Sequence, residues 1–370
     1  MTGAFPAQYG NATAGAFDLS MRKGNNEKFE YILQMGTGGL EAGIEGPLSK
    51  KENSSFMVNY RYAFLELFSK IGINFDTPAI PKYQDLTFKS DFKFGKTSLS
   101  LWGLGGFCSM KLEPDKNTLN FTKNLRTLMG SQTNVAGLTM KNIINSKSNL
   151  QTSVAFTNYK SIMSVDSVFK NGNDFNFFGG DYAENKLIAT TKYKYRFNPR
   201  NRIIVGASYI HSFINFADSA KIENRYFYMT KNSGNYGLAQ FNAQFQHSFH
   251  EKLELTLGGF SQYLLLNSSL SVEPRIAIKY SPNEDNSFSF AYGLHSQTQP
   301  GNVYFCQTLT DSTNQIYEHT NTVLDFSKNH HFVLGYNVNI TRNFILKTEL
   351  YYQNLFNIPI EMRESHYSVI

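Results

Sequence analysis

The sequence predicts an all-β protein that crosses a membrane with antiparallel strands. Three observations lead to this prediction: an aromatic-rich composition with few charges, a period-two alternation of apolar and polar residues, and connections that are alternately short and long. The 370 residues include 32 Phe and 22 Tyr, and only 17% are charged, against roughly 25% in typical soluble domains. Aromatic side chains are enriched in strands, so this composition favours β structure.

Composition and charge exclude several other classes of protein. No apolar stretch approaches the ~20 residues that a membrane-spanning helix needs, which excludes a helical membrane protein. The formal net charge of +6 comes without a dense block of Lys and Arg, so it is weak evidence for nucleic-acid binding. Cys108 and Cys306 have no Cys or His beside them at ligand spacing, which excludes a zinc module and a disulfide scaffold. We expect two buried thiols without a bridge.

The alternation gives each expected strand one apolar and one polar face. About fifteen segments show it, at the ~10-residue length of transmembrane strands. The apolar members of the five clearest segments are Leu86, Phe88, Phe92 and Phe94; Tyr193, Tyr195 and Phe197; Leu270, Val272, Ile276, Ile278 and Tyr280; Phe288, Phe290, Tyr292 and Leu294; and Phe332, Leu334, Tyr336, Val338 and Ile340.

The connections between these segments are alternately short and long. Short turns are expected near residues 50–53, 95–96, 146–147, 199–201, 250–251, 282–286 and 341–343. Long polar loops are expected at residues 66–82, 108–130, 161–184, 217–234 and 297–330. Outer-membrane barrels have this arrangement, with short periplasmic turns and long extracellular loops.

An open sheet in lipid would leave backbone groups at its edges unpaired, at several kcal/mol per group, so we expect the sheet to close. The first ten residues show no export signal. Together with the odd number of strands and an end inside an expected loop, this favours a chain that is the middle of a larger protein.

The first 25 residues do not follow the alternation of the later segments. They contain a Tyr-Gly pair, a stretch of small residues, and a short strand-like segment that closes with a basic residue and Gly: Tyr9, Gly10, Gly15, Asp18, Arg22 and Gly24. This order resembles the end of the plug domain of TonB-dependent outer-membrane receptors. Five later motifs are similar to those of Bacteroidetes-type receptors with a carboxypeptidase-like regulatory domain: Glu45-Gly46-Pro47-Leu48, Val58-Asn59-Tyr60-Arg61-Tyr62, Glu273-Pro274-Arg275, Gly293-Leu294-His295-Ser296-Gln297 and Tyr351-Tyr352-Gln353-Asn354-Leu355-Phe356-Asn357-Ile358-Pro359.

The resemblance implies a fold and a function. Such receptors have a 22-stranded barrel filled by an N-terminal plug. Residues 1–25 would be the C-terminal end of the plug, and residues 26–370 an incomplete barrel of about 15 strands. The implied function is TonB-energised uptake of an unidentified nutrient across the outer membrane of a Gram-negative cell. The implied partners are the TonB complex, through a coupling segment that these residues lack, outer-membrane lipid, an extracellular ligand and a surface lipoprotein.

The sequence contains no catalytic constellation. It has no Gly-x-Ser-x-Gly elbow, no His-Glu-x-x-His pair and no complete phosphate loop, so we expect neither an enzyme nor a cofactor. Adjacent residues of a strand point to opposite faces, so His330 and His331 are not expected to share a metal ion.

Charged residues gather on the polar faces, which would line the barrel lumen: Lys89, Lys93, Lys192, Lys194, Arg196, Glu273, Arg275, Lys279, Lys347 and Glu349. Such a basic lining could concentrate anionic solutes. We favour the other explanation, in which these cations pair with Asp91, Glu273, Glu349 and carboxylates of the plug.

The ligand is expected at the extracellular loops, where residues 171–182, 226–236 and 299–322 mix aromatic and amide side chains. A chelate, a glycan or a peptide would suit them equally. Two other functions stay open: a passive porin-like channel, and a surface β-protein that transports nothing. A segment that resembles a plug argues against the first, and lipid-facing Phe and Leu argue against the second.

Overall fold

In the computed structural model, the described residues are 5–36, 39–49, 53–63, 81–113, 125–168, 175–222, 225–311, 313–314 and 316–360, with the backbone alone at 222, 225–229, 309 and 311. They form one antiparallel sheet of 15 strands, in which every strand pairs with its neighbours along the chain. The strands are β1 (Glu30–Gly36), β2 (Gly39–Ser49), β3 (Ser54–Tyr62), β4 (Lys82–Phe94), β5 (Thr97–Leu112), β6 (Leu125–Asn145), β7 (Ser148–Ser167), β8 (Phe175–Asn198), β9 (Asn201–Ile222), β10 (Arg225–His250), β11 (Leu253–Leu264), β12 (Ser269–Tyr280), β13 (Asn286–Gln297), β16 (Ser327–Thr341) and β17 (Phe344–Phe356). The predicted all-β antiparallel fold is confirmed.

The connection between β13 and β16 carries the remaining regular structure. It contains α2 (Gly301–Tyr304), a two-stranded hairpin of β14 (Thr308–Asp311) and β15 (Ile316–Glu318), and the 3₁₀ turn η2 (Thr320–Val323). Among the described residues, no helix is long and apolar enough to cross a membrane.

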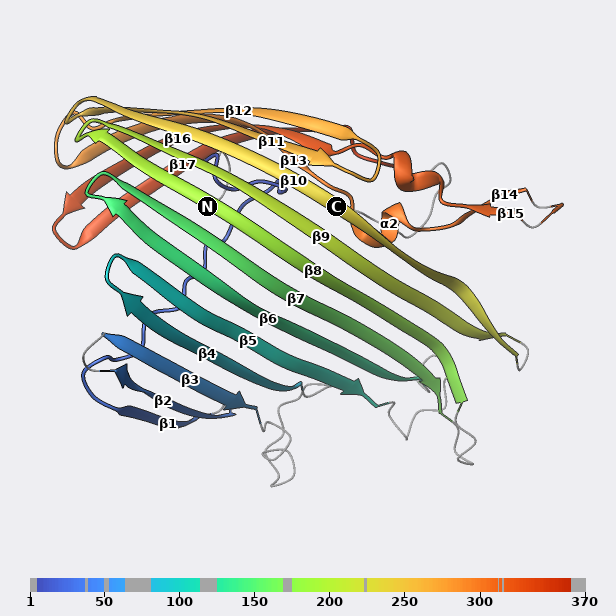
Figure 1. The fold of residues 1–370 in the computed structure, drawn as a ribbon. Helices are drawn as coiled ribbons and strands as arrows, with labels where there is room; N and C mark the ends of the chain where they lie inside the picture. The colour runs from blue at the N-terminus through green and yellow to red at the C-terminus, as the bar shows by residue number, and fades with distance from the viewer. Residues whose placement is uncertain are drawn as a thin grey trace.

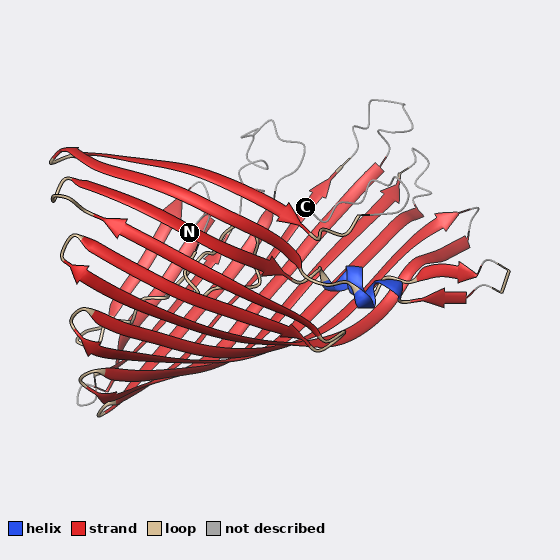
Figure 2. Ribbon diagram, turned by 90° about the horizontal axis from the view of Figure 1, so that it is seen from above, coloured by secondary structure: helices blue, strands red, loops and turns tan. Residues whose placement is uncertain are grey.

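The sheet is curved into a trough, with β1 to β3 on one side and β11 to β17 on the other (Figure 1). Seen from above, the strands wrap around the N-terminal part of the chain (Figure 2). Residues 5–24 lie against the concave face, where side chains of β2, β10, β12 and β16 all bond to them. One short segment contacts strands near both ends of the strand order because the sheet curves around it.

The alternation in sequence corresponds to the two faces of this sheet. On β12, Leu270 and Val272 are 59% and 64% exposed on the convex face, whereas Glu273 and Arg275 are 0% and 6% exposed on the concave face. The register carries the pattern across strands, since Phe290 pairs with Ile278 and with Leu334, all on the convex side. The convex face is thus an apolar surface, and the concave face is polar and partly covered.

The central strands are longer than the ~10 residues that the sequence led us to expect. Strands β6 to β10 have 20 to 26 residues. Most of the loops expected at residues 161–184 and 217–234 is therefore strand, and that part of the loop prediction is wrong. The polarity of these segments predicts loops. Their backbones stay paired because the adjacent strands are equally long.

The two ends of the sheet differ, and we name them the turn end and the loop end. At the turn end the expected tight connections are present in the described residues, for example at Gly95, whose φ of +57° lies in the left-handed region that Gly adopts without strain. Residues 50–52 of the first expected turn lie outside the described residues. At the loop end, residues 66–80 and 114–124 of two expected loops lie outside the described residues. Both cysteines are free as expected, but Cys108 is exposed and Cys306 half-buried, so the expected burial is wrong.

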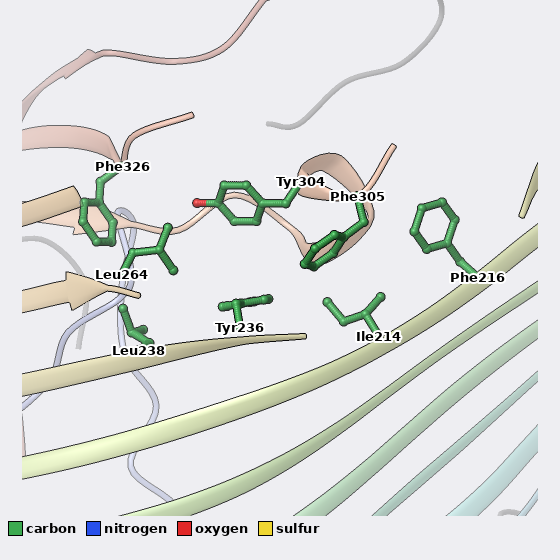
Figure 3. Packing of buried hydrophobic residues seen from close by; sticks show 8 residues of the cluster. All are labelled: Ile214, Phe216, Tyr236, Leu238, Leu264, Tyr304, Phe305 and Phe326. Atoms are coloured by element: carbon green, nitrogen blue, oxygen red, sulfur yellow. The ribbon is translucent and has the colours of Figure 1, made fainter. Parts of the chain in front are cut away.

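A hydrophobic cluster forms where the β13–β16 connection folds back onto the concave face (Figure 3). Tyr304 of α2 and Phe305, the residue that follows α2, pack against side chains of the wall, and the ring centroids of Tyr304 and Tyr236 are 5.7 Å apart. Gly301 permits this approach, because a Cβ there would lie 1.6 Å from the Ile214 side chain. The members are Ile214, Phe216, Tyr236, Leu238, Leu264, Tyr304, Phe305 and Phe326. This cluster fixes the connection over the loop end of β9 to β11.

If the convex face contacts lipid, a charge there is far more costly than a charge on the concave face. We predict that Phe290→Lys destabilises the protein by roughly 2–4 kcal/mol, as expected for Lys at the bilayer midplane. Ala291→Lys, one residue away on the concave face between Ala277 and Val333, is the matched control. The measurement is the fraction of folded, heat-modifiable protein in outer-membrane preparations. Equal losses for the two variants would contradict a lipid-facing convex surface.

Candidate functional site

The candidate site is the contact between segment 5–24 and the concave wall. The segment has almost no regular secondary structure, so its backbone groups need partners outside itself. The wall supplies them with side chains from several strands. The Ala7 N–H donates to Gln244 Oε1 (3.2 Å), and Asn329 donates to the Thr13 carbonyl (2.9 Å). The polar faces of the strands therefore act as the hydrogen-bonding environment of this segment.

Arg275 on β12 is the main attachment point. Its Nη1 donates to the carbonyl oxygens of Phe5 (3.3 Å), Pro6 (2.9 Å) and Tyr9 (2.5 Å), and its Nη2 donates to Glu273 Oε2 (2.6 Å). The guanidinium also lies 4.9 Å from the ring centroid of Phe5, a cation–π distance. One buried side chain thus holds three carbonyls of the first turn of the segment.

The buried charge pair formed by Arg275 and Glu273 makes further hydrogen bonds on both sides. Glu273 is fully buried and also accepts hydrogen bonds from Ser296 Oγ (2.5 Å) and Gln262 Nε2 (3.3 Å). Burying two charges is favourable only when their remaining hydrogen-bonding capacity is met. Here Ser296 and Gln262 donate to the carboxylate, and carbonyls of segment 5–24 accept from Nη1 of the guanidinium, whose Nε has no hydrogen-bond partner among the described residues. The pair therefore depends on the segment as much as the segment depends on the pair.

Two buried histidines complete this attachment, a role that the sequence pattern did not predict. The Phe5 ring lies 4.0 Å from the ring of His295, which in turn lies 4.6 Å from the ring of His331. The Thr13 carbonyl accepts a hydrogen bond from Nε2 of His331 (2.7 Å). Period-two alternation does put both histidines on the polar face, but it does not reveal that β13 and β16 are neighbours in the sheet.

A second attachment lies at the other end of the segment, on β2 and β4. Arg22 binds both carboxylate oxygens of Glu45 through its two terminal nitrogens, with Nη2 donating to Oε1 at 2.8 Å. The Asn25 N–H donates to the same carboxylate (3.1 Å), and Lys89 Nζ donates to the Met21 carbonyl (3.0 Å). This bidentate geometry is the strong form of an Arg–carboxylate contact.

Between the attachments, the conspicuous residues of the segment have structural roles. The Tyr9 hydroxyl donates to Asp18 Oδ2 (2.6 Å), and burial together with the Asp18 carboxylate raises the pKa of Tyr9 to about 12. A Cβ on Gly10 would lie 1.9 Å from the Phe260 ring, and a Cβ on Gly24 would lie 2.2 Å from the Phe56 carbonyl oxygen. Both positions thus require Gly. Gly15 makes an isolated β-bridge.

The charged residues singled out from the sequence fall into two groups. Lys89, Lys192 and Arg275 contact the segment, with Lys192 donating to the Gln8 side chain (3.2 Å). The expected pairing of these cations with nearby carboxylates occurs at two places, Lys89–Asp91 (3.4 Å) and Arg275–Glu273 (2.6 Å). The others lie at concave positions of β4, β8, β12 and β17, set by the register with these residues: Lys93, Lys194, Arg196, Lys279, Lys347 and Glu349.

Within the part of the chain that the structure describes, no group of three or more His, Cys, Asp or Glu side chains could hold a metal ion. His330 and His331 point to opposite faces, since His330 lies 3.1 Å from the Tyr292 hydroxyl on the convex side. The two expected ligand loops at residues 171–182 and 226–236 are mostly strand in β8 and β10. Residues 299–322 form the folded connection described above.

A scan against protein-family models finds no match, and a search of curated proteins finds none either. Solved structures do match. The ferric-catecholate import receptor Fiu from E. coli K12 has a TM-score of 0.70 at 10% identity, over 96% of this chain and 62% of that one. A mutant of the ferric enterobactin receptor from Pseudomonas aeruginosa has a TM-score of 0.68 at 11% identity, over 96% and 57%. The pyoverdine outer membrane receptor FpvA from P. aeruginosa has 0.66 at 14%, over 96% and 57%.

At these identities the likeness shows the fold. The chain has the strand arrangement of TonB-dependent receptor barrels, and it spans little more than half the length of the solved receptors that it matches, 57% for the ferric enterobactin receptor and 62% for Fiu. The alignment covers nearly the whole chain.

Removing the Arg275 guanidinium should leave the buried Glu273 carboxylate without its cation. We predict that Arg275→Met destabilises the protein by about 3–5 kcal/mol, the usual cost of breaking a buried pair, and exposes segment 5–24 to protease. The double variant Glu273→Gln/Arg275→Met should recover part of the stability but not the protection, because three carbonyls still lack their donor. Lys279→Met, an exposed concave-face position, is the control. Thermal unfolding and limited proteolysis measure both effects, and an unprotected segment in the unmodified protein would contradict the attachment.

Proposed function

We propose that this chain belongs to an outer-membrane receptor that takes up a nutrient with energy from the TonB complex. The observation that carries the proposal is the attachment of segment 5–24 to the concave face, although the segment is not a strand of the wall. Arg275 of the wall bonds to one end of the segment, and Arg22 of the segment bonds to the wall at the other end. A passive channel needs an open lumen, so a segment that crosses it argues against passive diffusion. The fold shared with TonB-dependent receptor barrels supports the same function.

The domain assignment is part of this proposal. Residues 1–25 are the C-terminal end of a plug, and residues 26–370 form about two-thirds of a barrel wall. Two features support it: the change from irregular chain to strand at Glu30, and the free edges of β1 and β17 in the sheet of the described residues. Backbone groups at free edges have no partners in hydrocarbon, so further strands must cover them in a membrane. The order of sequence motifs supports the Bacteroidetes-type subgroup.

The orientation follows from the connections. The loop end faces the outside of the cell and the turn end faces the periplasm. The convex face contacts outer-membrane lipid, while the concave residues, including Lys93, Lys194, Arg196, Lys347 and Glu349, line the lumen around the plug. The hydrophobic cluster then lies near the extracellular mouth, where it fixes the β13–β16 connection over the lumen. A surface lipoprotein is a further proposed partner at this end.

The ligand class is a chelate, a glycan or a peptide. The matching structures are named as receptors for ferric enterobactin, ferric catecholates and pyoverdine, so an iron–siderophore complex is the first ligand to test.

The test is uptake by cells that make the full-length protein. We predict that deleting its gene abolishes accumulation of one of three radiolabelled probes, a ferric catecholate, an oligosaccharide or a peptide, and that complementation restores it. A protonophore, which removes the energy that TonB transmits, should abolish the same uptake.

The outcomes separate the proposed functions. Uptake that survives the protonophore would identify a passive channel and would refute the TonB-energised mechanism. Unchanged accumulation of all three probes after deletion would refute a transport function for these ligand classes. Arg275→Met should reduce energised uptake while the protein still reaches the outer membrane, because the plug end is no longer held at its lumen position.

A further inference from the structure

Three methionines lie side by side on the concave face at the loop end of the wall. Met110 of β5 pairs with Met129 of β6, and Met129 pairs with Met163 of β7. The three strands are consecutive in the sheet and adjacent in Figure 1. Met110 is an even number of positions from Ser100, whose hydroxyl donates to Asp91 on the concave face, so the two side chains share that face. We name the three methionines the methionine row.

The methionine row is not part of a packed core. Met129 and Met163 are 39% and 37% exposed, and Met110 is half-buried. None of the three belongs to the hydrophobic cluster under the β13–β16 connection or packs against it. Methionine is flexible and has a polarisable thioether. The row therefore presents three adaptable sulfur-containing side chains to the lumen.

The register puts these thioethers within reach of one ion. Side chains directly opposite each other on paired strands have Cβ atoms about 5 Å apart. Met129 lies between the other two, so Met110 and Met163 are two strand spacings apart, about 10 Å. Each side chain has three rotatable bonds. The outer two can therefore turn towards an ion held above Met129.

Cys108 adds a fourth sulfur on the same face. It precedes Met110 by two positions on β5, which puts both side chains on the concave side. It pairs with Ser131, so it is diagonal to Met129, at a distance of about 7–8 Å. The thiol is free and the residue is exposed. Three thioethers and one thiol thus lie on three neighbouring strands.

The neighbours of these sulfurs on the same face of β5 to β7 are uncharged. They are Leu112, Thr127 and Val165 on the side of the loop end, and Ser131 and Ser161 on the side of the turn end. Thioether and thiolate ligands select Cu(I), whereas carboxylates, carbonyls and water suit Mg²⁺, Ca²⁺ and Mn²⁺. A coordinating thiol is deprotonated. One thiolate and one monovalent ion give a neutral site, whereas a divalent ion would leave a positive charge among uncharged neighbours.

We infer that the methionine row and Cys108 form a binding site for a soft monovalent metal ion, and that Cu(I) is its biological occupant. Binding forms metal–sulfur bonds to three thioethers and one thiolate. The proton of the thiol is released to solvent, and no oxidation state changes. The site is distinct from the Arg275 and Arg22 attachments of segment 5–24, and the inference does not depend on which nutrient the protein takes up.

An apolar contact is the other use of such a surface, since methionine also packs well against irregular partners. The two uses depend on different properties of the side chain. Exchanging Met for Leu conserves volume and apolar character, but it removes the sulfur. Leucine variants of the methionine row therefore abolish metal binding and leave an apolar contact in place.

The test measures binding of Ag(I), a soft monovalent ion that is stable in air, to the purified full-length protein in chloride-free buffer. Cu(I) is then measured without oxygen, by competition with a chromogenic chelator, and Zn(II) is the divalent comparison. We expect Ag(I) and Cu(I) to bind, and Met129→Leu and Cys108→Ser to weaken both at least about tenfold, because even changes outside the ligand shell cost 10–100-fold in metal affinity.

Each variant has a matched control. Met140→Leu makes the same exchange on the convex side of β6, where Met140 is 41% exposed. Cys306→Ser changes the other cysteine. We expect both controls to bind Ag(I) as the unmodified protein does. X-ray absorption of the bound ion should show a first shell of sulfur that loses one scatterer in Met129→Leu.

Three results would overturn the inference. They are unchanged Ag(I) affinity in the triple variant Met110→Leu/Met129→Leu/Met163→Leu, a first shell of nitrogen or oxygen, and Zn(II) binding as tight as Ag(I) binding. Heat-modifiable migration shows whether each variant is folded, and the absorption spectrum of the unmodified protein decides the question without any variant. All these measurements use purified protein, so the proposed transport function is tested separately.

Discussion

The pairing of every inner strand with two neighbours is the constraint on which the structure depends. It satisfies the backbone along strands of up to 26 residues, and it forces successive side chains to opposite faces. A single wall can therefore present different chemistry on its two sides, as the adjacent residues Val272 and Glu273 do. Curvature then gives the two faces different surroundings, because only the concave one encloses part of the chain.

The sequence was informative wherever this period-two rule acts alone. The faces of β12 and β13 follow from counting residues, and so does the position of Arg275 on the enclosed side. The rule also marks where strands contain apolar residues, but not where they end. The polarity of residues 175–184 predicts a loop, although the register with β7 and β9 keeps them in the sheet. Pairing with a partner strand is a long-range property that local polarity does not reveal.

The parts that could not be predicted depend on contacts between distant segments. Tyr304 and Phe305 are aromatic residues in a polar stretch, and their burial exists only because α2 folds back onto Ile214 and Tyr236. His295 and His331 come together because β13 and β16 are neighbours across the intervening connection. The Arg22–Glu45 contact could not be predicted, because the sequence does not show that the first segment runs along the concave face. In each case the residues were visible in the sequence, but their partners were not.

The contact between segment 5–24 and the wall differs in kind from a protein core. It is made mainly of hydrogen bonds from wall side chains to backbone carbonyls, at Phe5, Pro6, Tyr9, Thr13 and Met21. A folded core loses its stabilisation when it opens, because apolar surface meets water. A polar contact exchanges protein partners for water, and the net free energy of such an exchange is only about 0.5–1.5 kcal/mol per hydrogen bond. The segment is therefore positioned by many bonds of small net value, with one buried charge pair that fixes its place. The hydrophobic part of the contact is small, since Phe5 and Ala7 are the buried apolar residues of the described segment. A wall built in this way holds an irregular segment in a defined position mainly through polar bonds.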